Sequence, residues 1–279
     1  MPPCPPDQIA HYTCRRVNRP PVIDGRLDEP SWQNAQRSPR FVDMLAGTPG
    51  FFDTRAAAMW DDNYLYVGFW IQEPFVRAEF TERDSLVFRE NDVEVFIDGG
   101  DCYYEFEINA LGTIYEVFFV WQDAYTRGSR FETPEFDLLA RRAVSFAGDY
   151  DRRPESFWRG THPRGPRWAF LDWDFPGLRS AVQINGTIND DSDVDDGWTV
   201  ELAFPWTEMK TLAGGRALPP NDGDTWRMLF ARFEALRVCG QEVTPHPGWS
   251  WNPHGAYDSH IPECFTYVHF SRDVVGTGR

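Results

Sequence analysis

The sequence predicts an all-β protein. Three observations lead to this class: short apolar runs that alternate with period two, turn residues that separate those runs, and an aromatic content of 16% without the long helical periodicity of a bundle. A chain of 279 residues is long enough to bury a substantial core. We therefore expect one large antiparallel β-sandwich, interrupted by a long irregular insertion.

Residues 92–109 show the clearest strand pattern, because they alternate apolar and acidic side chains across a glycine turn at 98–101. Since side chains in a strand alternate, Val93 and Val95 face one side while Glu94 faces the other. Pairing of the two strands gathers four polar side chains on one sheet surface: Glu94, Glu105, Glu107 and Asn109. Such a surface suits a polyhydroxylated ligand or a cation. A solvated outer face is the alternative.

Other parts of the chain carry the remaining strands and the connections between them. Residues 1–21 are rich in proline and charge, which predicts an N-terminal strap outside the core, with residues 22–279 forming the single domain. Residues 122–180 are rich in arginine, proline and glycine, which predicts the insertion, with a short helix at about 134–142. Further strands are expected at residues 56–60, 64–72, 114–121, 181–188, 198–204 and 226–236.

The net charge excludes several classes of partner. A formal charge of −16 and a pI near 4.7 repel phosphate backbones and anionic lipids, so we expect neither nucleic acid nor a membrane as partner. Lys210 is the sole lysine and lies in neither a P-loop nor a Schiff-base context. Neutral or cationic small ligands remain open, and the sequence does not define an oligomeric state.

The five cysteines indicate neither a disulfide framework nor a zinc site, because they are scattered and lack CxxC spacing. Cys4 and Cys14 form a candidate bridge if the protein is exported. The N-terminus lacks the profile of a signal peptide, so the sequence as written predicts a cytoplasmic protein, or an extracellular one if a leader has been removed.

An acidic turn at residues 189–197 resembles a calcium loop. It fails the EF-hand register, because glycine falls at 197 instead of 196 and Leu202 occupies the last ligand position. A solvated hairpin turn is the alternative. The metal ligands stay unassigned, and no organic cofactor is expected.

Five segments, taken in order, resemble carbohydrate-binding module family 9 and together cover most of the chain. They are Ile23-Asp24-Gly25 with Asp28 and Trp32, residues 60–67, residues 92–98, residues 197–206, and residues 251–270. The resemblance implies a β-sandwich related to the DOMON superfamily that binds saccharides without catalysis and carries a structural calcium ion.

The resemblance also implies a binding site. Phe88 falls at the position of one aromatic clamp ring, Glu94 at that of an acidic hydroxyl acceptor, and Glu107 where an arginine would be expected. The second ring is expected in the C-terminal loop, where any one of four residues could supply it: Trp249, Trp251, Tyr257 or His260. The predicted ligand-binding residues are Phe88, Glu94, Glu107, Asn109, Trp251, Tyr257 and His260.

Two other functions compete with saccharide binding. Glu94 and Glu107 offer the carboxyl pair of a glycoside hydrolase, although exposed strand carboxylates would lack the burial that raises the pKa of a catalytic acid. DOMON relatives hold haem between methionine and histidine, for which Met209 and His260 are candidates.

Overall fold

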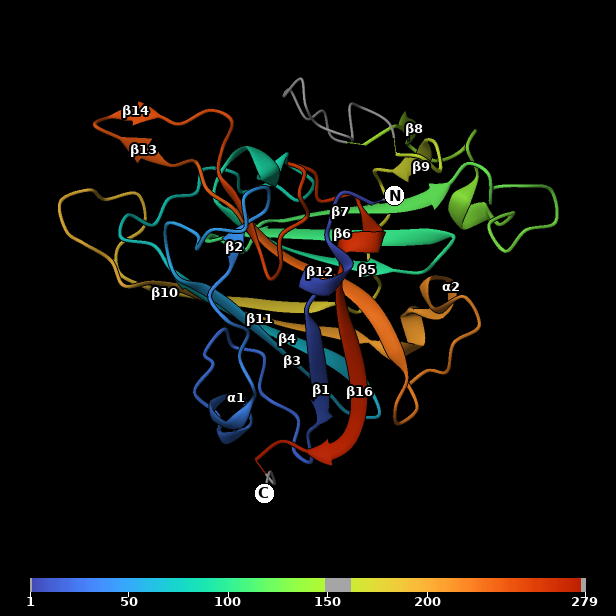
Figure 1. Cartoon of the computed structure of the whole chain (residues 1–279), viewed down its shortest axis with the longest axis horizontal. Helices are drawn as coiled ribbons and strands as arrows, with labels where there is room; N and C mark the ends of the chain where they lie inside the picture. The colour runs from blue at the N-terminus through green and yellow to red at the C-terminus, as the bar shows by residue number, and fades with distance from the viewer. Residues whose placement is uncertain (1, 149–161, 277–279) are drawn as a thin grey trace.

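The structure, a computed structural model, describes residues 2–148 and 162–276 and is a two-layered β-sandwich (Figure 1). Its strands are β1 (His11–Arg16), β2 (Val42–Asp43), β3 (Thr54–Trp60), β4 (Tyr64–Gln72), β5 (Asp92–Asp98), β6 (Cys102–Asn109), β7 (Ile114–Trp121), β8 (Ala143–Phe146), β9 (Arg167–Phe170), β10 (Arg179–Asn185), β11 (Gly197–Pro205), β12 (Thr225–Phe233), β13 (Arg237–Val238), β14 (Gln241–Glu242), β15 (Gly248–Ser250) and β16 (Thr266–Val274). The helices α1 (Pro30–Asn34) and α2 (Lys210–Ala213) are each about one turn long, and 3₁₀ turns occupy Pro6–Gln8, Val87–Arg89, Pro134–Phe136, Trp206–Glu208 and Pro262–Cys264.

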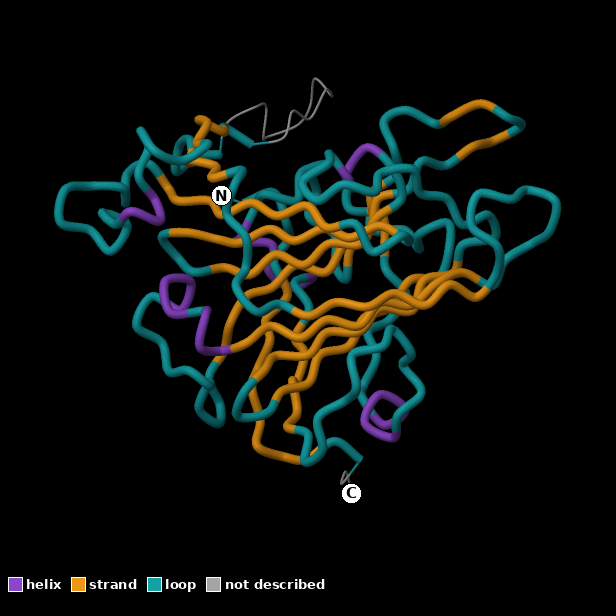
Figure 2. Tube along the Cα trace, turned by 180° about the vertical axis from the view of Figure 1, so that it is seen from behind, coloured by secondary structure: helices purple, strands orange, loops and turns teal. Residues whose placement is uncertain are grey.

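Most of the strands run in one continuous path that folds over to make the two layers of the sandwich, while β15 and β2 branch from β12, and β13 pairs with β14 apart from this path. The order within the described residues is β10-β11-β4-β3-β1-β16-β12-β5-β6-β7-β9-β8. The layer of β10, β11, β4 and β3 crosses the layer of β5, β6 and β7 (Figure 1). The view from the opposite side shows the same two stacked layers (Figure 2). The predicted β-sandwich is therefore confirmed.

The core lies between the two layers and is rich in aromatic rings. Phe106 of β6 contacts Phe204 of β11 with ring centroids 5.8 Å apart, and Phe69 of β4 contacts Phe230 of β12 at 6.3 Å. Val93, Val95 and Ile97, the apolar face of β5, are fully buried here. This inner face of the hairpin thus has the composition that the alternation predicts.

The predicted hairpin forms in register, which sets out its second face. Glu94 lies directly opposite Glu107, and Phe96 lies opposite Glu105. Strand β7 continues the layer and places Tyr115 opposite Glu107. The acidic face of β5 and β6 consequently points away from the core, to the outer side of the layer.

The motif around Ile23-Asp24-Gly25 holds the other layer together. The Glu201 carboxylate of β11 accepts hydrogen bonds from the backbone N–H groups of Asp24 and Gly25, at 3.0 and 3.2 Å, and from Trp32 Nε1 at 2.8 Å. Trp32 is fully buried. These residues of the family resemblance therefore serve packing on the side of the sandwich away from β5 and β6.

The prediction of an N-terminal strap outside the core is wrong. Residues 11–16 form β1, which pairs in parallel with both β16 and β3, so the sheet is mixed instead of wholly antiparallel. Tyr12 and Cys14 are buried in the core. Pairing partners about 250 residues away, such as Tyr267 opposite His11, compensate for the polar composition of this segment.

The proposed Cys4–Cys14 bridge is also wrong. Cys4 forms a disulfide with Cys264, across a sequence separation of 260 residues, while Cys14 is free and buried. Since successive side chains in a strand alternate, the side chain of Cys14 belongs to the inner face of β1 and packs in the core.

The insertion extends the second layer. Strand β9 pairs with β7, and β8 pairs with β9, so the described part of residues 122–180 covers the edge of the sheet. The helix expected at 134–142 is a single 3₁₀ turn at Pro134–Phe136. Residues 149–161 lie outside the described residues. In the part of the chain that the structure describes, the helices are too short to cross a bilayer.

Candidate functional site

A cavity of about 1080 Å³ lies on the outer face of the β5–β6–β7 layer. Its floor comes from the acidic face of the hairpin, and its walls come from the insertion and from the loops around β15. The residues that line it are Asp43, Leu45, Phe88, Arg89, Glu94, Glu105, Glu107, Tyr115, Phe119, Phe146, Ala169, Leu171, Phe233, Glu242, Pro245, His246, Pro247, Gly248, Tyr257, Ser259 and His260. The cavity thus combines aromatic rings with carboxylates.

The carboxylates of the floor are buried, which corrects the expectation of exposed strand acids. Glu94 and Glu107 are 2% and 1% exposed. Elements far apart in the sequence build the walls around these two carboxylates. Burial, followed by the carboxylates of Glu105, Asp92 and Glu94, raises the pKa of Glu107 well above its ordinary value.

Asp92 lies beside these acids at the start of β5. Its Oδ1 accepts a hydrogen bond from the backbone N–H of Phe233 at 3.1 Å. Burial again raises the pKa of Asp92 well above its ordinary value. Asp92, Glu94 and Glu107 each offer one oxygen, and these three oxygens lie within 4.8 Å of one another.

His260 belongs to the wall of the cavity, and both of its ring nitrogens lie near polar side chains. Its Nδ1 lies 3.1 Å from the Tyr103 hydroxyl, which accepts a hydrogen bond from Arg167 Nε at 3.0 Å. Burial, then the charge of Arg167, lowers the pKa of His260 well below its ordinary value. Nε2 of the same ring lies 3.6 Å from Glu105 Oε1.

Phe88 and Tyr257 supply rings at the cavity. Phe88 is 40% exposed and meets Tyr115 edge to face at 5.7 Å. Tyr257 packs edge to face on Phe233 at 5.7 Å, and its hydroxyl donates to the carbonyl oxygen of His246 at 2.5 Å. Among the C-terminal loop residues left open by the sequence, Tyr257 and His260 line the cavity.

Asn109 and Trp251 do not line the cavity. The Asn109 side chain donates to the Phe80 carbonyl at 2.9 Å and accepts from the backbone N–H groups of Leu111 and Thr113, which fixes the turn after β6. Trp251 is 6% exposed and packs in the core against Phe230 at 5.1 Å. Of the seven predicted residues, the structure brings five together: Phe88, Glu94, Glu107, Tyr257 and His260.

Sequence reasoning missed several aromatic walls. Tyr115 and Phe119 could have been found, because they alternate along β7 and lie opposite Glu107 and Tyr103. Phe146 comes from the insertion, and its ring lies 4.5 Å from that of His260. No sequence signal places this residue beside the hairpin, since it depends on how the insertion folds back.

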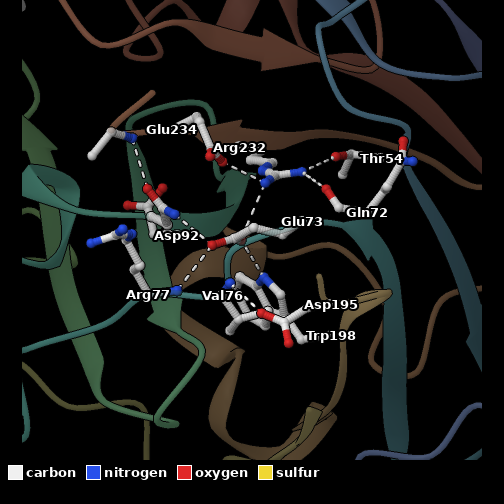
Figure 3. A network of polar contacts seen from close by, with 12 residues as sticks. Thr54, Gln72, Glu73, Val76, Arg77, Asp92, Asp195, Trp198, Arg232 and Glu234 are labelled. Atoms are coloured by element: carbon white, nitrogen blue, oxygen red, sulfur yellow. Dashed lines mark hydrogen bonds and ion pairs between the residues drawn. The ribbon is translucent and has the colours of Figure 1, made fainter. Parts of the chain in front are cut away.

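A buried polar network adjoins the floor (Figure 3). The Arg232 guanidinium donates to Glu73 Oε2 at 3.2 Å, to Thr54 Oγ1 at 2.9 Å and to Glu234. Glu73 also accepts from Trp198 Nε1 at 2.7 Å. The positive charge of Arg232 is therefore shared by Glu73 and Glu234, two acids outside the floor of the cavity.

The acidic turn at 189–197 is a hydrogen-bonded turn. Asp195 Oδ2 accepts from the Val76 N–H at 2.8 Å, and Oδ1 accepts from the Thr187 N–H at 2.7 Å. Asp191 forms an ion pair with Arg77. Asp191 and Asp195 thus already have hydrogen-bond or ion-pair partners within the protein.

The haem ligands suggested by the sequence do not meet. Met209 is buried in the inner core, whereas His260 packs against Phe96 and Phe119 on the outer side of the same layer. Two axial ligands must face one iron. A haem held by this pair is therefore excluded.

Residues 23–124 match the model of the family described as carbohydrate family 9 binding domain-like. This match includes the hairpin and four of the seven predicted site residues: Phe88, Glu94, Glu107 and Asn109. The resemblance to family 9 is thereby confirmed for this part of the chain.

The chain is similar to a curated relative and to several solved structures. Endo-1,4-beta-xylanase A of Thermotoga maritima is 33% identical over 92 residues, which are 30% of this chain and 8% of that enzyme. A provisionally named carbohydrate-binding protein from Bacteroides uniformis superposes with a TM-score of 0.56 at 16% identity, over 94% of this chain and all of its own.

The second structure is a family 9 module from Caldicellulosiruptor kristjanssonii in complex with cellotriose. Its TM-score is 0.50 at 13% identity, over 96% of this chain and 98% of that one. Structural similarity at such low sequence identity shows the fold alone. The fold of nearly the whole chain, including β10 to β16 beyond the family match, is accordingly that of this module.

Proposed function

We propose that the chain is a non-catalytic saccharide-binding protein whose ligand occupies the cavity over β5, β6 and β7. The observation that carries this proposal is the convergence of aromatic rings and carboxylates in one cavity. Sugar rings present apolar C–H faces that pack on aromatic planes, and their hydroxyls donate hydrogen bonds to carboxylate oxygens. Phe88 and Tyr257 offer the planes, and Glu94 and Glu107 offer the acceptors.

The comparisons support this proposal. The family model covers the hairpin, and a structural neighbour of the same family holds cellotriose. The matched xylanase acts on a polysaccharide by name, although the chain spans only 8% of its length. The cavity of about 1080 Å³ is the size of a site for a small organic ligand, at the upper end of the usual range.

Hydrolysis is disfavoured by the arrangement of the acids. Glu94 and Glu107 face each other across adjacent strands and approach a ligand from the same side. An oxygen of Glu94 and an oxygen of Glu107 lie within 4.8 Å of each other. In an inverting glycosidase the two carboxyl groups are roughly 6.5 to 9.5 Å apart, which leaves room for the attacking water. A retaining enzyme needs about 5 Å, but with carboxyl groups that flank the bond. Turnover of an aryl glycoside that is lost in Glu94→Gln would contradict a non-catalytic role.

A glycan-array screen of the intact protein in calcium buffer tests the proposal. We expect binding to a defined group of glycans, weakened at least tenfold in Phe88→Ala. Phe75→Ala is the matched control, because Phe75 is 44% exposed and does not line the cavity. Absence of binding to plant, microbial and host glycans, or equal loss in both variants, would contradict the site.

A further inference from the structure

Three buried acids, Asp92, Glu94 and Glu107, gather at the floor of the cavity. Asp92 and Glu94 lie two residues apart on the same face of β5, and Glu107 lies opposite Glu94 on β6. Asp92 is fully buried, and the other two are at most 2% exposed. Their oxygens converge to within 4.8 Å of one another.

Two oxygens of this group lack hydrogen-bond donors. Asp92 Oδ2 and Glu107 Oε2 are buried and have no hydrogen-bond partner among the described residues. Arg232, the nearby buried cation, is engaged by Glu73 and Glu234. A buried carboxylate oxygen without a donor is costly, and a bound cation removes that cost.

We propose that Asp92, Glu94 and Glu107 bind one Ca²⁺ ion on the floor of the cavity. Oxygens that lie 2.3 to 2.6 Å from one calcium ion are at most about 5 Å apart, which the observed limit of 4.8 Å satisfies. The smaller Mg²⁺ holds its ligands at about 2.0 to 2.1 Å and keeps most of its waters, so it suits this carboxylate group less well.

The ion also gives the site a way to recognise its ligand, a step that rests on the proposed function. Calcium takes six to eight oxygen ligands, and three carboxylates do not fill that shell. Glu94 and Glu107 line the cavity, so an ion that they hold would face it. Paired hydroxyls of a saccharide would complete the coordination, and the ligand class is therefore a sugar bound through calcium.

Calorimetric titration of Ca²⁺ into the chelator-treated full chain tests the ion site. We expect one ion per chain, a rise in the melting temperature, and at least a tenfold loss of affinity in both Asp92→Asn and Glu107→Gln. Asp193→Asn in the acidic turn is the matched control and should bind like the parent. Absence of calcium binding, or binding lost in the control but kept in Glu107→Gln, would overturn the proposal.

Folding of the variants is checked separately. In chelator, Asp92→Asn and Glu107→Gln should melt at or above the temperature of the parent, because each amide removes a buried acid. A variant that melts lower in chelator and regains its stability with Ca²⁺ would show that the ion binds elsewhere.

Saccharide binding with and without calcium separates this proposal from the function itself. We expect the affinity for the best array ligand to fall at least tenfold in chelator. Equal affinity in both buffers would overturn the calcium-mediated contact and leave saccharide binding intact. Calcium binding at the three acids without any saccharide ligand would uphold the ion site and refute the proposed function.

Discussion

The two faces of the β5–β6 hairpin share one alternation pattern but differ in how the fold covers them. The inner face meets the opposite layer, where Phe106 packs against Phe204. The outer face is roofed by the insertion and the loops near β15, which stand off and leave a cavity of about 1080 Å³. A strand pair can thus combine a filled core with a functional surface, because its two faces are covered by different parts of the chain.

The largest effect is expected on the inner face. Phe106→Ala leaves a void among packed rings and should lower the free energy of unfolding by about 3 to 5 kcal/mol. Denaturant unfolding measures this loss. If the loss were below about 1 kcal/mol, the inner face would not be a tightly packed core, and the contrast between the faces would fail.

The second prediction concerns His254, which lies outside both faces of the hairpin and should make the folded protein less stable in acid. Burial lowers the pKa of His254 to about 4. Below pH 6.5 this histidine binds a proton in the unfolded chain but stays unprotonated in the folded chain until the pH nears 4. The free energy of unfolding therefore falls as the pH drops from 6.5 toward 4. At pH 5 this amounts to about 2 kcal/mol.

His254→Asn removes this titration and keeps a donor for the carbonyl oxygen of Asp258, which His254 Nδ1 contacts at 2.9 Å. Unfolding measured at pH 7 and pH 5 should then show a smaller difference than in the parent. An unchanged difference would mean that other groups cause the acid sensitivity.

On the outer face, a ring can be removed at little cost to stability. Phe88→Ala should change the free energy of unfolding by less than about 0.5 kcal/mol, because the ring is 40% exposed. Affinity for the array ligand should fall at least tenfold, by about 1.4 kcal/mol or more. A variant with a large stability loss would assign Phe88 to the core instead.

The smallest effect is expected at the rim of the cavity. Glu242 is exposed and pairs with His246 at 2.7 Å. Because exposed ion pairs contribute little, Glu242→Gln should change ligand affinity by less than about threefold. A larger change in titration calorimetry would extend the recognition surface from the floor to the rim.

The local part of this structure could be predicted from the sequence. Alternation along residues 92–109 predicted both faces of the hairpin and placed Glu94 and Glu107 on the same face, because strand geometry has period two. Burial of the same acids could not be predicted. It depends on Phe146 and Tyr257, which reach the cavity from segments with no periodic signal.

Long-range pairing limited the prediction of the fold as well. Strand β1 is polar and short, and its place in the sheet depends on β16 at the other end of the chain. The Cys4–Cys264 disulfide likewise joins distant cysteines, whereas spacing suggested Cys14. The composition of a segment does not indicate which distant segment it will contact, so neither β16 as the partner of β1 nor Cys264 as the partner of Cys4 could be predicted.

The Cys4–Cys264 disulfide closes almost the whole chain into a covalent ring. A protease that cuts once inside this ring, for instance in the exposed β13–β14 hairpin, opens the ring but leaves a single molecule. Cleavage would separate fragments only after reduction. Strands β1 and β16, which lie near the two ends of the chain, pair side by side in parallel, so the N-terminus and the C-terminus leave the sandwich at opposite ends (Figure 1).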